Sequence, residues 1–126
     1  MKIGIVGTRR RSTMGDYYAV AHALKDWLCQ VPEISNNYTR LVSGGCHKGA
    51  DCFVPRLTKE FRLNKPIIHK PQYHLYGDNA TFVRNTLVAK DSDILIACVA
   101  PDRKGGTENT ITKFQEFHPE GKLIIV

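Results

Sequence analysis

The run Asp93-Ile94-Leu95-Ile96-Ala97-Cys98-Val99 is the most apolar stretch of the chain. A short, continuous apolar run with β-branched residues predicts a strand that is buried on both faces, as in a parallel sheet. We therefore expect it to be the central strand. Four further runs of this kind predict the other strands, at Lys2–Val6, Thr39–Ser43, Pro66–His69 and Lys122–Val126.

Apolar residues at helical spacing lie between these runs. They predict a helix from Gly15 or Asp16 to about Cys29, and further helices over Lys48–Phe61, Asn79–Lys90 and Glu108–Phe117. Pro55 lies inside the second helix, where it either kinks the helix or moves its start to a later residue. The other segments predict loops, at Val31–Asn37, Lys70–Asp78 and Ala100–Thr107.

Strands that alternate with helices predict an α/β fold, in which a parallel sheet is covered on both faces. Right-handed crossovers favour a single doubly wound, Rossmann-like domain over residues 1–126, with strand order 3-2-1-4-5. Trp27 lies at helical spacing and is expected in the core. The apolar stripe of the third helix is expected to contain Phe82, Val83, Leu87 and Val88.

The composition is typical of a globular protein, since 42% of the 126 residues are hydrophobic and 24% are charged. No apolar run approaches the roughly 20 residues of a membrane helix, and the N-terminal apolar stretch is too short for a signal peptide. We therefore expect a cytoplasmic protein with no membrane partner, in the host cytoplasm if the protein is viral. The formal charge of +6 favours anionic partners such as nucleotides or nucleic acid.

The cysteines indicate neither disulfides nor a metal site. Cys29, Cys46, Cys52 and Cys98 form no Cys-x-x-Cys pair, and they are expected to be buried free thiols. His47 follows Cys46, but a metal would need further ligands at a set spacing, which the sequence lacks. No metal and no cofactor are expected.

Glycines and basic or hydroxyl residues follow three of the predicted strands. A glycine after a strand permits a sharp turn and a close approach of a ligand to the backbone. The helix that follows offers unpaired N–H groups and a partial positive charge, which suit phosphate. Ligands of doubly wound sheets bind where the strand order reverses, here between strands one and four. The expected ligand-binding residues are Gly7, Thr8, Arg9, Ser43, Gly44, Gly45, Lys48, Arg84, Asn85, Gly105, Gly106 and Thr107.

Five blocks of the sequence, in this order, resemble the SLOG superfamily. This Rossmann-like group includes the LOG phosphoribohydrolases, the DNA-processing protein A family and the YspA-related proteins, and the similarity to the YspA-like branch is the strongest. The matching blocks span residues 4–107: Gly4-Ile5-Val6-Gly7-Thr8-Arg9, Val42 to Asp51 with its Ser43-Gly44-Gly45, Arg84-Asn85, Asp93 to Ala97, and Gly105-Gly106-Thr107.

The resemblance implies that the chain binds a nucleotide or a nucleotide derivative such as ADP-ribose. The phosphoribohydrolase branch also implies cleavage of an N-glycosidic bond, for which Glu108, Asp51 and Asp93 are the candidate carboxylates. That branch places its acid three residues after the threonine of the Gly-Gly-x-Gly-Thr motif. Here Thr110 occupies the position three residues after Thr107, and Glu108 follows the threonine directly. A step of one residue rotates a helical side chain by about 100°, so the catalytic role does not transfer directly.

Three functions remain open from the sequence. The first is a sensor or sequestering protein for a signalling nucleotide, without turnover. The second is an N-glycosidase that uses Glu108 or Asp51. The third is single-stranded DNA binding, which the positive charge permits, although no aromatic residues alternate with basic ones. Tyr73, His74 and Tyr76 either stack on a base or pack within their own loop. A homo-oligomer is expected, with the apolar faces of the third and fourth helices as its candidate contact.

Overall fold

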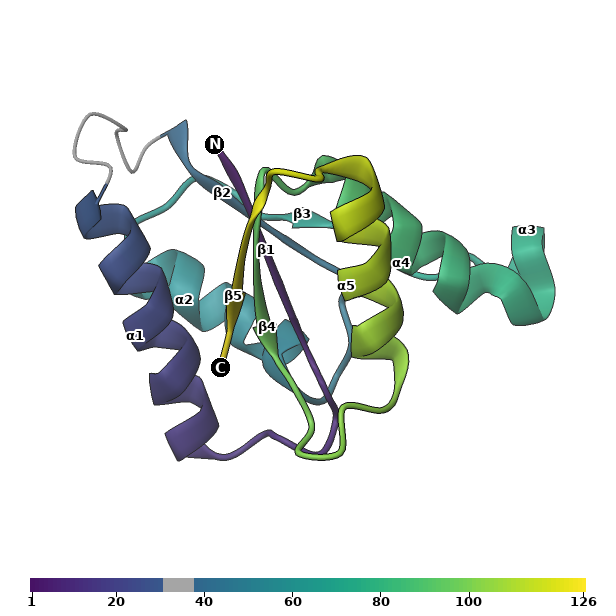
Figure 1. Ribbon diagram of the computed structural model, residues 1–126, viewed down its shortest axis with the longest axis horizontal. Helices are drawn as coiled ribbons and strands as arrows, with labels where there is room; N and C mark the ends of the chain where they lie inside the picture. Colours follow the sequence, from purple (N-terminus) through teal and green to yellow (C-terminus); the bar gives the residue numbers. More distant parts are fainter. Residues whose placement is uncertain (31–37) are drawn as a thin grey trace.

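The computed structural model describes residues 1–30 and 38–126, so the predicted loop at 31–37 lies outside the described residues. Five parallel strands form one sheet in the order β3-β2-β1-β4-β5, which confirms the predicted topology (Figure 1). The strands are β1 (Lys2–Gly7), β2 (Arg40–Ser43), β3 (Ile67–Ile68), β4 (Ile94–Cys98) and β5 (Lys122–Ile125).

The central strand is β1 and not β4, so that prediction was wrong. β1 pairs with β2 through Gly4 opposite Val42, and with β4 through Ile5 opposite Ile96. All five residues of β4 are nevertheless buried. A continuous apolar run indicates that helices cover both faces of a strand, but it does not indicate the position of the strand in the sheet. Both faces of β4 are covered, although β4 is not the middle strand.

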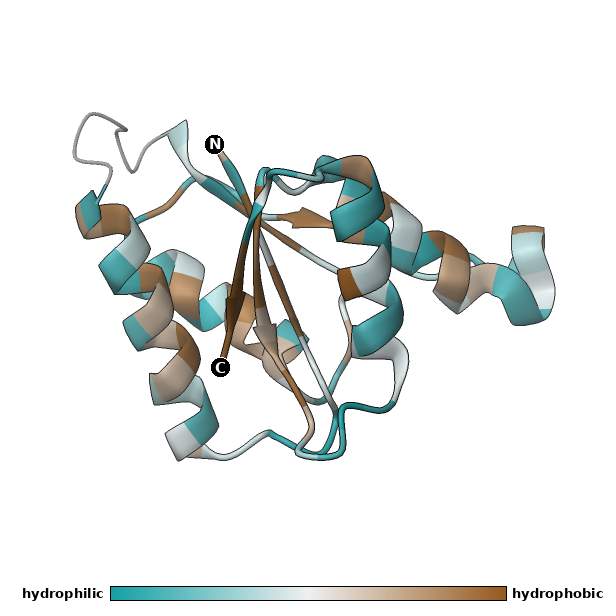
Figure 2. Cartoon of the chain, in the orientation of Figure 1, coloured by the Kyte–Doolittle hydropathy of each residue, from teal (hydrophilic) through white to brown (hydrophobic). Residues whose placement is uncertain are grey.

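The helices cover both faces of the sheet (Figure 1). α1 (Met14–Gln30) and α2 (Val54–Glu60) lie on one face, and α4 (Ala80–Asp91) and α5 (Gly106–Phe117) lie on the other. The β-strands supply side chains alternately to the two faces. Ile3 and Ile5 of β1 therefore pack with α1 and α2, while Val6 packs with α4 and α5. Figure 2 shows these strands as the most hydrophobic part of the fold.

The predicted second helix starts later than Lys48. A 3-10 turn, η2 (Ala50–Phe53), precedes α2, and Pro55 occupies the first turn of α2. Proline fits this position because the N–H that it lacks has no partner inside the helix there. Of the two readings of Pro55, the later start is the one observed.

The predicted loop over Lys70–Asp78 contains two short helices, α3 (Tyr73–Tyr76) and η3 (Gly77–Asn79). They show no apolar periodicity, and none of their residues is buried. Figure 1 shows α3 projecting from the body of the fold beyond α4. The side chains of Tyr73 and Tyr76 are 60% and 46% exposed, so they do not pack inside their own segment.

The expected core needs three further corrections. In α4, Val88 is buried together with Ala89, but Phe82 and Leu87 are exposed. Trp27 is half-buried at the edge of the core and donates from Nε1 to the Met1 sulfur, at 3.2 Å. Of the cysteines, all free, only Cys98 is buried: Cys46 is half-buried, and Cys29 and Cys52 are exposed.

Within residues 1–30 and 38–126, no helix is long and apolar enough to cross a membrane. No group of three or more histidine, cysteine or acidic residues in the same ranges has the arrangement of a metal site.

Candidate functional site

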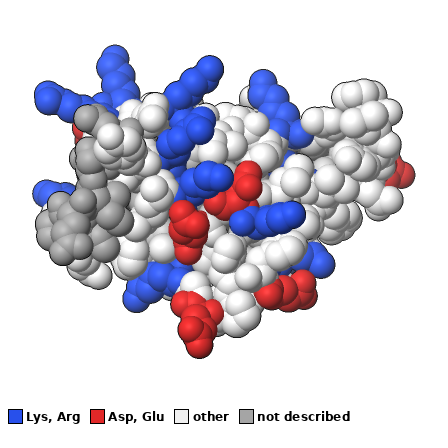
Figure 3. All heavy atoms as spheres, turned by 90° about the horizontal axis from the view of Figure 1, so that it is seen from above, with Lys and Arg blue, Asp and Glu red and all other residues white. Residues whose placement is uncertain are grey.

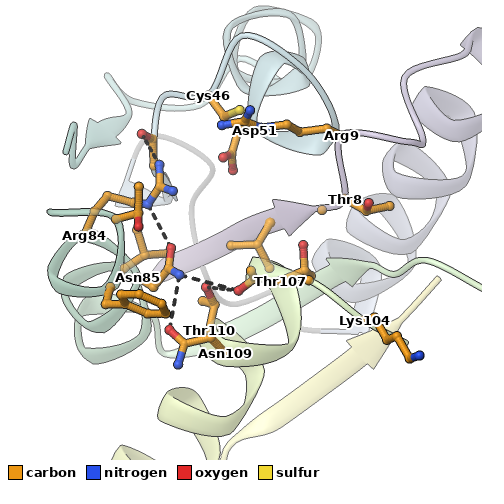
Figure 4. A pocket seen from close by; sticks show the side chains of 18 of the residues that line it. Thr8, Arg9, Cys46, Asp51, Arg84, Asn85, Lys104, Thr107, Asn109 and Thr110 are labelled. Carbon is orange, nitrogen blue, oxygen red and sulfur yellow. Dashed lines mark hydrogen bonds between the residues drawn. The ribbon is translucent and has the colours of Figure 1, made fainter. Parts of the chain in front are cut away.

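A cavity of about 660 Å³ lies at the carboxyl ends of β1 and β4, between the loops that follow β1, β2 and β4 (Figure 4). Its volume is in the range of small-molecule sites. The strands β1 and β4 are neighbours at the point where the strand order reverses, so the position is the predicted one. The lining residues are Val6, Gly7, Thr8, Arg9, Arg10, Gly44, Cys46, Asp51, Thr81, Phe82, Arg84, Asn85, Val88, Lys104, Gly105, Gly106, Thr107, Asn109 and Thr110.

The loop after β1 supplies Gly7, Thr8 and Arg9. A Cβ on Gly7 would lie 2.6 Å from the Cβ of Ala50, so only glycine allows η2 to pack this close. The Thr8 N–H donates to the Cys98 carbonyl at 3.0 Å, which ties this loop to the end of β4. These contacts fix the backbone from which Arg9 extends.

The three consecutive arginines have different roles. Arg10 forms a bidentate pair with Asp102 at 3.1 and 2.5 Å. Arg11 pairs with Asp16 at 3.0 Å and donates to the Val99 and Val126 carbonyls. The Arg9 guanidinium has neither a hydrogen bond nor an ion pair with any residue in 1–30 or 38–126, and it is exposed. Arg9 is therefore the arginine of this cluster that is free to bind an anion.

A chain of hydrogen bonds joins the loop after β2 to both helices on the cavity side. Arg84 donates from Nη1 to the Gly44 carbonyl at 3.0 Å and from Nε to Asn85 Oδ1 at 2.8 Å. Asn85 in turn donates from Nδ2 to Asn109 Oδ1 at 3.2 Å and to the Gly106 carbonyl at 3.5 Å (Figure 4). The predicted pair Arg84-Asn85 thus forms one wall of the cavity.

The structure does not bring Ser43, Gly45 and Lys48 to the cavity lining. Ser43 is buried, and its Oγ accepts a hydrogen bond from the Gly45 N–H at 3.0 Å. Gly45 has φ +70°, and a Cβ there would contact Ile68 of β3. Ser43 and Gly45 therefore shape the turn after β2, and Gly44, which lies between them, faces the cavity.

The loop after β4 brings Gly105, Gly106 and Thr107 to the start of α5. Gly105 has φ +120°, a conformation that only glycine adopts readily. No side chain among residues 1–30 and 38–126 caps this end of α5. The first N–H groups of a helix carry a partial positive charge, so this end of α5 suits a phosphate group.

Glu108 does not line the cavity. Its carboxylate forms a bidentate pair with Arg103, with both distances 2.9 Å. The helix turns the side chain away from the neighbouring residues Thr107 and Asn109, which do line the cavity. Asp93 lies at the opposite edge of the sheet, where its Oδ2 accepts from the Lys2 N–H at 2.8 Å. Neither position supports the catalytic role considered for these two residues.

Asp51 is the only carboxylate among the described residues that line the cavity. Its Oδ1 is buried and has no hydrogen-bond partner in the described part of the chain. Burial raises the pKa of Asp51 to about 6, although the charge of Arg84, the backbone N–H groups of Cys46 and Gly44, and the charge of Arg9 act in the opposite direction. The cavity therefore holds a carboxylate that is costly to keep ionised.

The comparisons with known proteins support the fold. No protein-family model and no curated protein matches the chain. Among solved structures, the chain is similar to DNA processing protein A from Helicobacter pylori, at 18% sequence identity and a TM-score of 0.60. The match covers 99% of this chain and 64% of that protein, which was described for its single-stranded DNA binding mode.

This likeness shows a shared Rossmann-like fold. The similar structure is a DNA processing protein A, and that family is one of the branches named in the sequence resemblance. The narrower similarity to the SLOG superfamily and its YspA-like branch stays a prediction. Figure 3 shows the edge of the sheet opposite the cavity, where lysines and arginines lie among aspartates and glutamates. The positive charge of the chain is therefore not gathered into one uniform patch on that face.

The prediction from sequence missed several lining residues, and helical periodicity is the signal that identifies four of them. Thr81 lies three residues before Arg84 on α4, and Val88 lies four residues after it. Asn109 and Thr110 lie three and four residues after Gly106 on α5. Residues at this spacing share one helix face. Lys104, Arg10 and Cys46 are neighbours of predicted residues in the three loops.

Proposed function

We propose that the cavity binds the phosphate-bearing end of a nucleotide or nucleotide derivative. The observation that carries the proposal is that three glycine-bearing loops and the uncapped start of α5 border one cavity together with Arg9, whose guanidinium forms no hydrogen bond or ion pair with a described residue. Backbone N–H groups and a guanidinium are the groups that proteins use to bind phosphate. The cavity volume of about 660 Å³ suits a ligand of this size.

A thermal-shift screen tests this proposal. The panel contains nucleoside mono-, di- and triphosphates, ADP-ribose and cyclic dinucleotides. A ligand at 100 times its Kd stabilises the folded state by roughly 2.7 kcal/mol, which is readily measured. Each hit is then incubated with the protein, and the mass of the recovered ligand is determined. An unchanged ligand mass supports a binding protein, whereas release of free base would identify an N-glycosidase.

The N-glycosidase hypothesis now depends on Asp51 alone, because Glu108 and Asp93 lie outside the cavity lining. A carboxyl group with a pKa of about 6 suits a general acid. If base is released, the Asp51→Asn variant should lose this activity, and Glu108→Gln should keep it.

Single-stranded DNA binding is the second candidate, and the structural neighbour favours it. The DNA processing protein A of Helicobacter pylori shares the fold and was described as a single-stranded DNA-binding protein. A single strand can place one nucleotide in the cavity and extend across the exposed aromatic side chains Phe82 and Tyr76.

Salt dependence separates the two candidates. For single strands, the logarithm of the binding constant falls with the logarithm of salt concentration with a slope of roughly −0.7 per phosphate contacted. Fluorescence anisotropy with a labelled oligothymidylate should give a slope steeper than about −2 if several phosphates bind. A nucleotide confined to the cavity would give a slope closer to about −1.

A homo-oligomer stays part of the proposal. Leu87 of α4 and Tyr73 and Leu75 of α3 are exposed apolar or aromatic side chains on the side of the molecule that carries α4. Light scattering after size-exclusion chromatography measures the mass directly. A mass of 14.2 kDa at micromolar concentration would reject the oligomer.

A further inference from the structure

The cavity is not uniformly suited to an anion, because Asp51 occupies one side of it. Figure 4 shows Asp51 beside Cys46 and the end of Arg9, whereas Thr107 and Asn109 of α5 lie on the opposite side. The other carboxylates near the loops are already paired: Asp102 with Arg10, Glu108 with Arg103 and Asp16 with Arg11. Asp51 lies near Arg84 and Arg9 but forms no ion pair with either within 4.0 Å.

An ionised carboxylate repels phosphate, so the side of the cavity next to Asp51 is the less favourable one for the phosphate group. Leaving a buried acceptor without a donor also costs free energy, roughly 1–3 kcal/mol. A ligand group that carries an O–H or N–H removes this cost. The start of α5, across the cavity, offers the opposite chemistry, namely backbone N–H groups.

Resting on the proposed function, we infer that the Asp51 carboxylate accepts a hydrogen bond from the nucleoside part of the ligand, and thereby directs the phosphate to the start of α5. The chemistry required of the ligand at Asp51 is a hydrogen-bond donor. A nucleotide has two sources of such a donor, the sugar hydroxyls and the amino or imino groups of the base. A single DNA strand supplies it from a base.

Arg84 keeps the carboxylate in place for this role. Two of its nitrogens are held by the Gly44 carbonyl and Asn85 Oδ1, so the guanidinium has a fixed position near Asp51. Its positive charge favours the ionised form of Asp51, which accepts hydrogen bonds more strongly than the protonated form. Burial raises the free-energy cost of the ionised form of Asp51, and a hydrogen bond from a bound donor would offset this cost.

The test uses calorimetric titration of the full chain at pH 7.5. AMP, GMP, CMP and UMP are titrated first, and the tightest of them becomes the parent ligand. Its 2′,3′-dideoxy counterpart lacks the sugar hydroxyls, and ribose 5-phosphate lacks the base. Each is titrated into the wild type, Asp51→Ala, Asp51→Asn and the exposed control Asp78→Asn, with melting temperatures as the check on folding.

A sugar donor predicts that Asp51→Ala weakens the parent and ribose 5-phosphate at least tenfold but leaves the dideoxy ligand unchanged. A base donor predicts a tenfold loss for the parent and the dideoxy ligand, with ribose 5-phosphate unchanged. Asp51→Asn should fall between the wild type and Asp51→Ala, and Asp78→Asn should match the wild type. The inference is overturned if Asp51→Ala leaves all affinities unchanged or changes all three equally.

The proposed function fails in a different way. If the wild type binds none of the four nucleotides, no ligand of the thermal-shift panel and no oligothymidylate, then the cavity does not bind nucleotides. The inference then falls with the proposed function. If the wild type binds a nucleotide but Asp51→Ala does not discriminate among the three ligands, the inference alone is wrong.

Discussion

Arg84 of α4 donates a hydrogen bond to the backbone carbonyl of Gly44, 3.0 Å away in the loop after β2. This contact spans 40 positions of the sequence, and it places a guanidinium beside the cavity. It depends on the missing side chain at position 44, because a Cβ there would lie 2.5 Å from Arg84 Cδ. A side chain at this position would therefore displace the end of Arg84.

Gly44→Ala should displace Arg84 and weaken ligand binding about tenfold, since a hydrogen bond to a charged group contributes roughly 1.5–3 kcal/mol. Isothermal titration with the best nucleotide of the panel measures this loss. Gly15→Ala is a matched control, because a Cβ there meets only Thr13 Oγ1 at 3.6 Å and α1 lies on the other face. Equal affinity of Gly44→Ala and the wild type would show that Arg84 is not needed for binding.

Arg9→Ala should weaken nucleotide binding by roughly tenfold. It should also reduce the slope of the logarithm of the binding constant against the logarithm of salt concentration by about the amount of one phosphate contact. The reason is that Arg9 lines the cavity and its exposed side chain forms no ion pair with another described residue, so it is free to turn from Asp51 to the ligand phosphate. Anisotropy titrations at several salt concentrations give both quantities. Lys25→Ala, an exposed change on α1, removes the same charge from a site remote from the cavity. If both variants lose affinity equally, the effect of Arg9 is only one of net charge.

Asn85→Ala should lower the free energy of unfolding by about 1–3 kcal/mol. Asn85 is 7% exposed, and it connects Arg84 to Asn109 and the Gly106 carbonyl. Alanine removes all three hydrogen bonds, so Arg84 Nε and Asn109 Oδ1 lose the partner that Asn85 provides. Urea denaturation measures the change, with Asn79→Ala as an exposed control at the start of α4. A change below about 0.5 kcal/mol, typical of surface positions, would contradict the structural role of Asn85.

Asp51 makes the free energy of unfolding depend on pH, and its raised pKa sets the direction of this dependence. Its pKa is raised from 3.8 to about 6 in the folded state, so the folded protein binds the proton more tightly than the unfolded chain. The stabilisation that this proton gives is complete below about pH 4 and is lost as the pH rises through about 6.

Asp51→Asn has no such group, so its stability relative to the wild type should rise between pH 4 and pH 7, by up to about 3 kcal/mol. Urea denaturation at pH 4.5, 5.5 and 7.0 gives the difference between the two proteins at each pH. Using the difference removes the contributions of the other titrating groups. A difference that does not vary with pH would mean that the pKa of Asp51 is not raised.

The topology could be predicted from the sequence because its determinants are local and strong. Apolar runs mark the strands, helical spacing marks the longer helices, and the handedness of crossovers leaves few orders for a parallel sheet. α3 was missed because Tyr73–Tyr76 buries none of its residues and so has no apolar stripe. The exposed Phe82 and Leu87 were misjudged because hydropathy alone does not show whether a packing partner is present.

The site was predicted less completely, because a sequence motif does not show which of its side chains point into the cavity. In β2, Leu41 packs with α1 and α2, and Val42 packs with α4 and α5. Continuing this alternation directs Gly44 to the cavity and turns Ser43 away from it. The motif alone did not make that distinction. The pairing of Glu108 with Arg103 joins side chains on the surface, and no pattern in the sequence specifies it.

The loop after β1 is held at its start by the close packing of Gly7 on Ala50 and the Thr8 hydrogen bond to Cys98, and near its end by the hydrogen bond from the Gly49 N–H to Ser12 Oγ. Between such anchors, side chains that face the cavity contribute little to the core on either side of the sheet. Substitutions at those positions therefore alter what is recognised at modest cost to folding. Such an arrangement lets ligand preference diverge among descendants of one ancestor while the framework beneath stays the same.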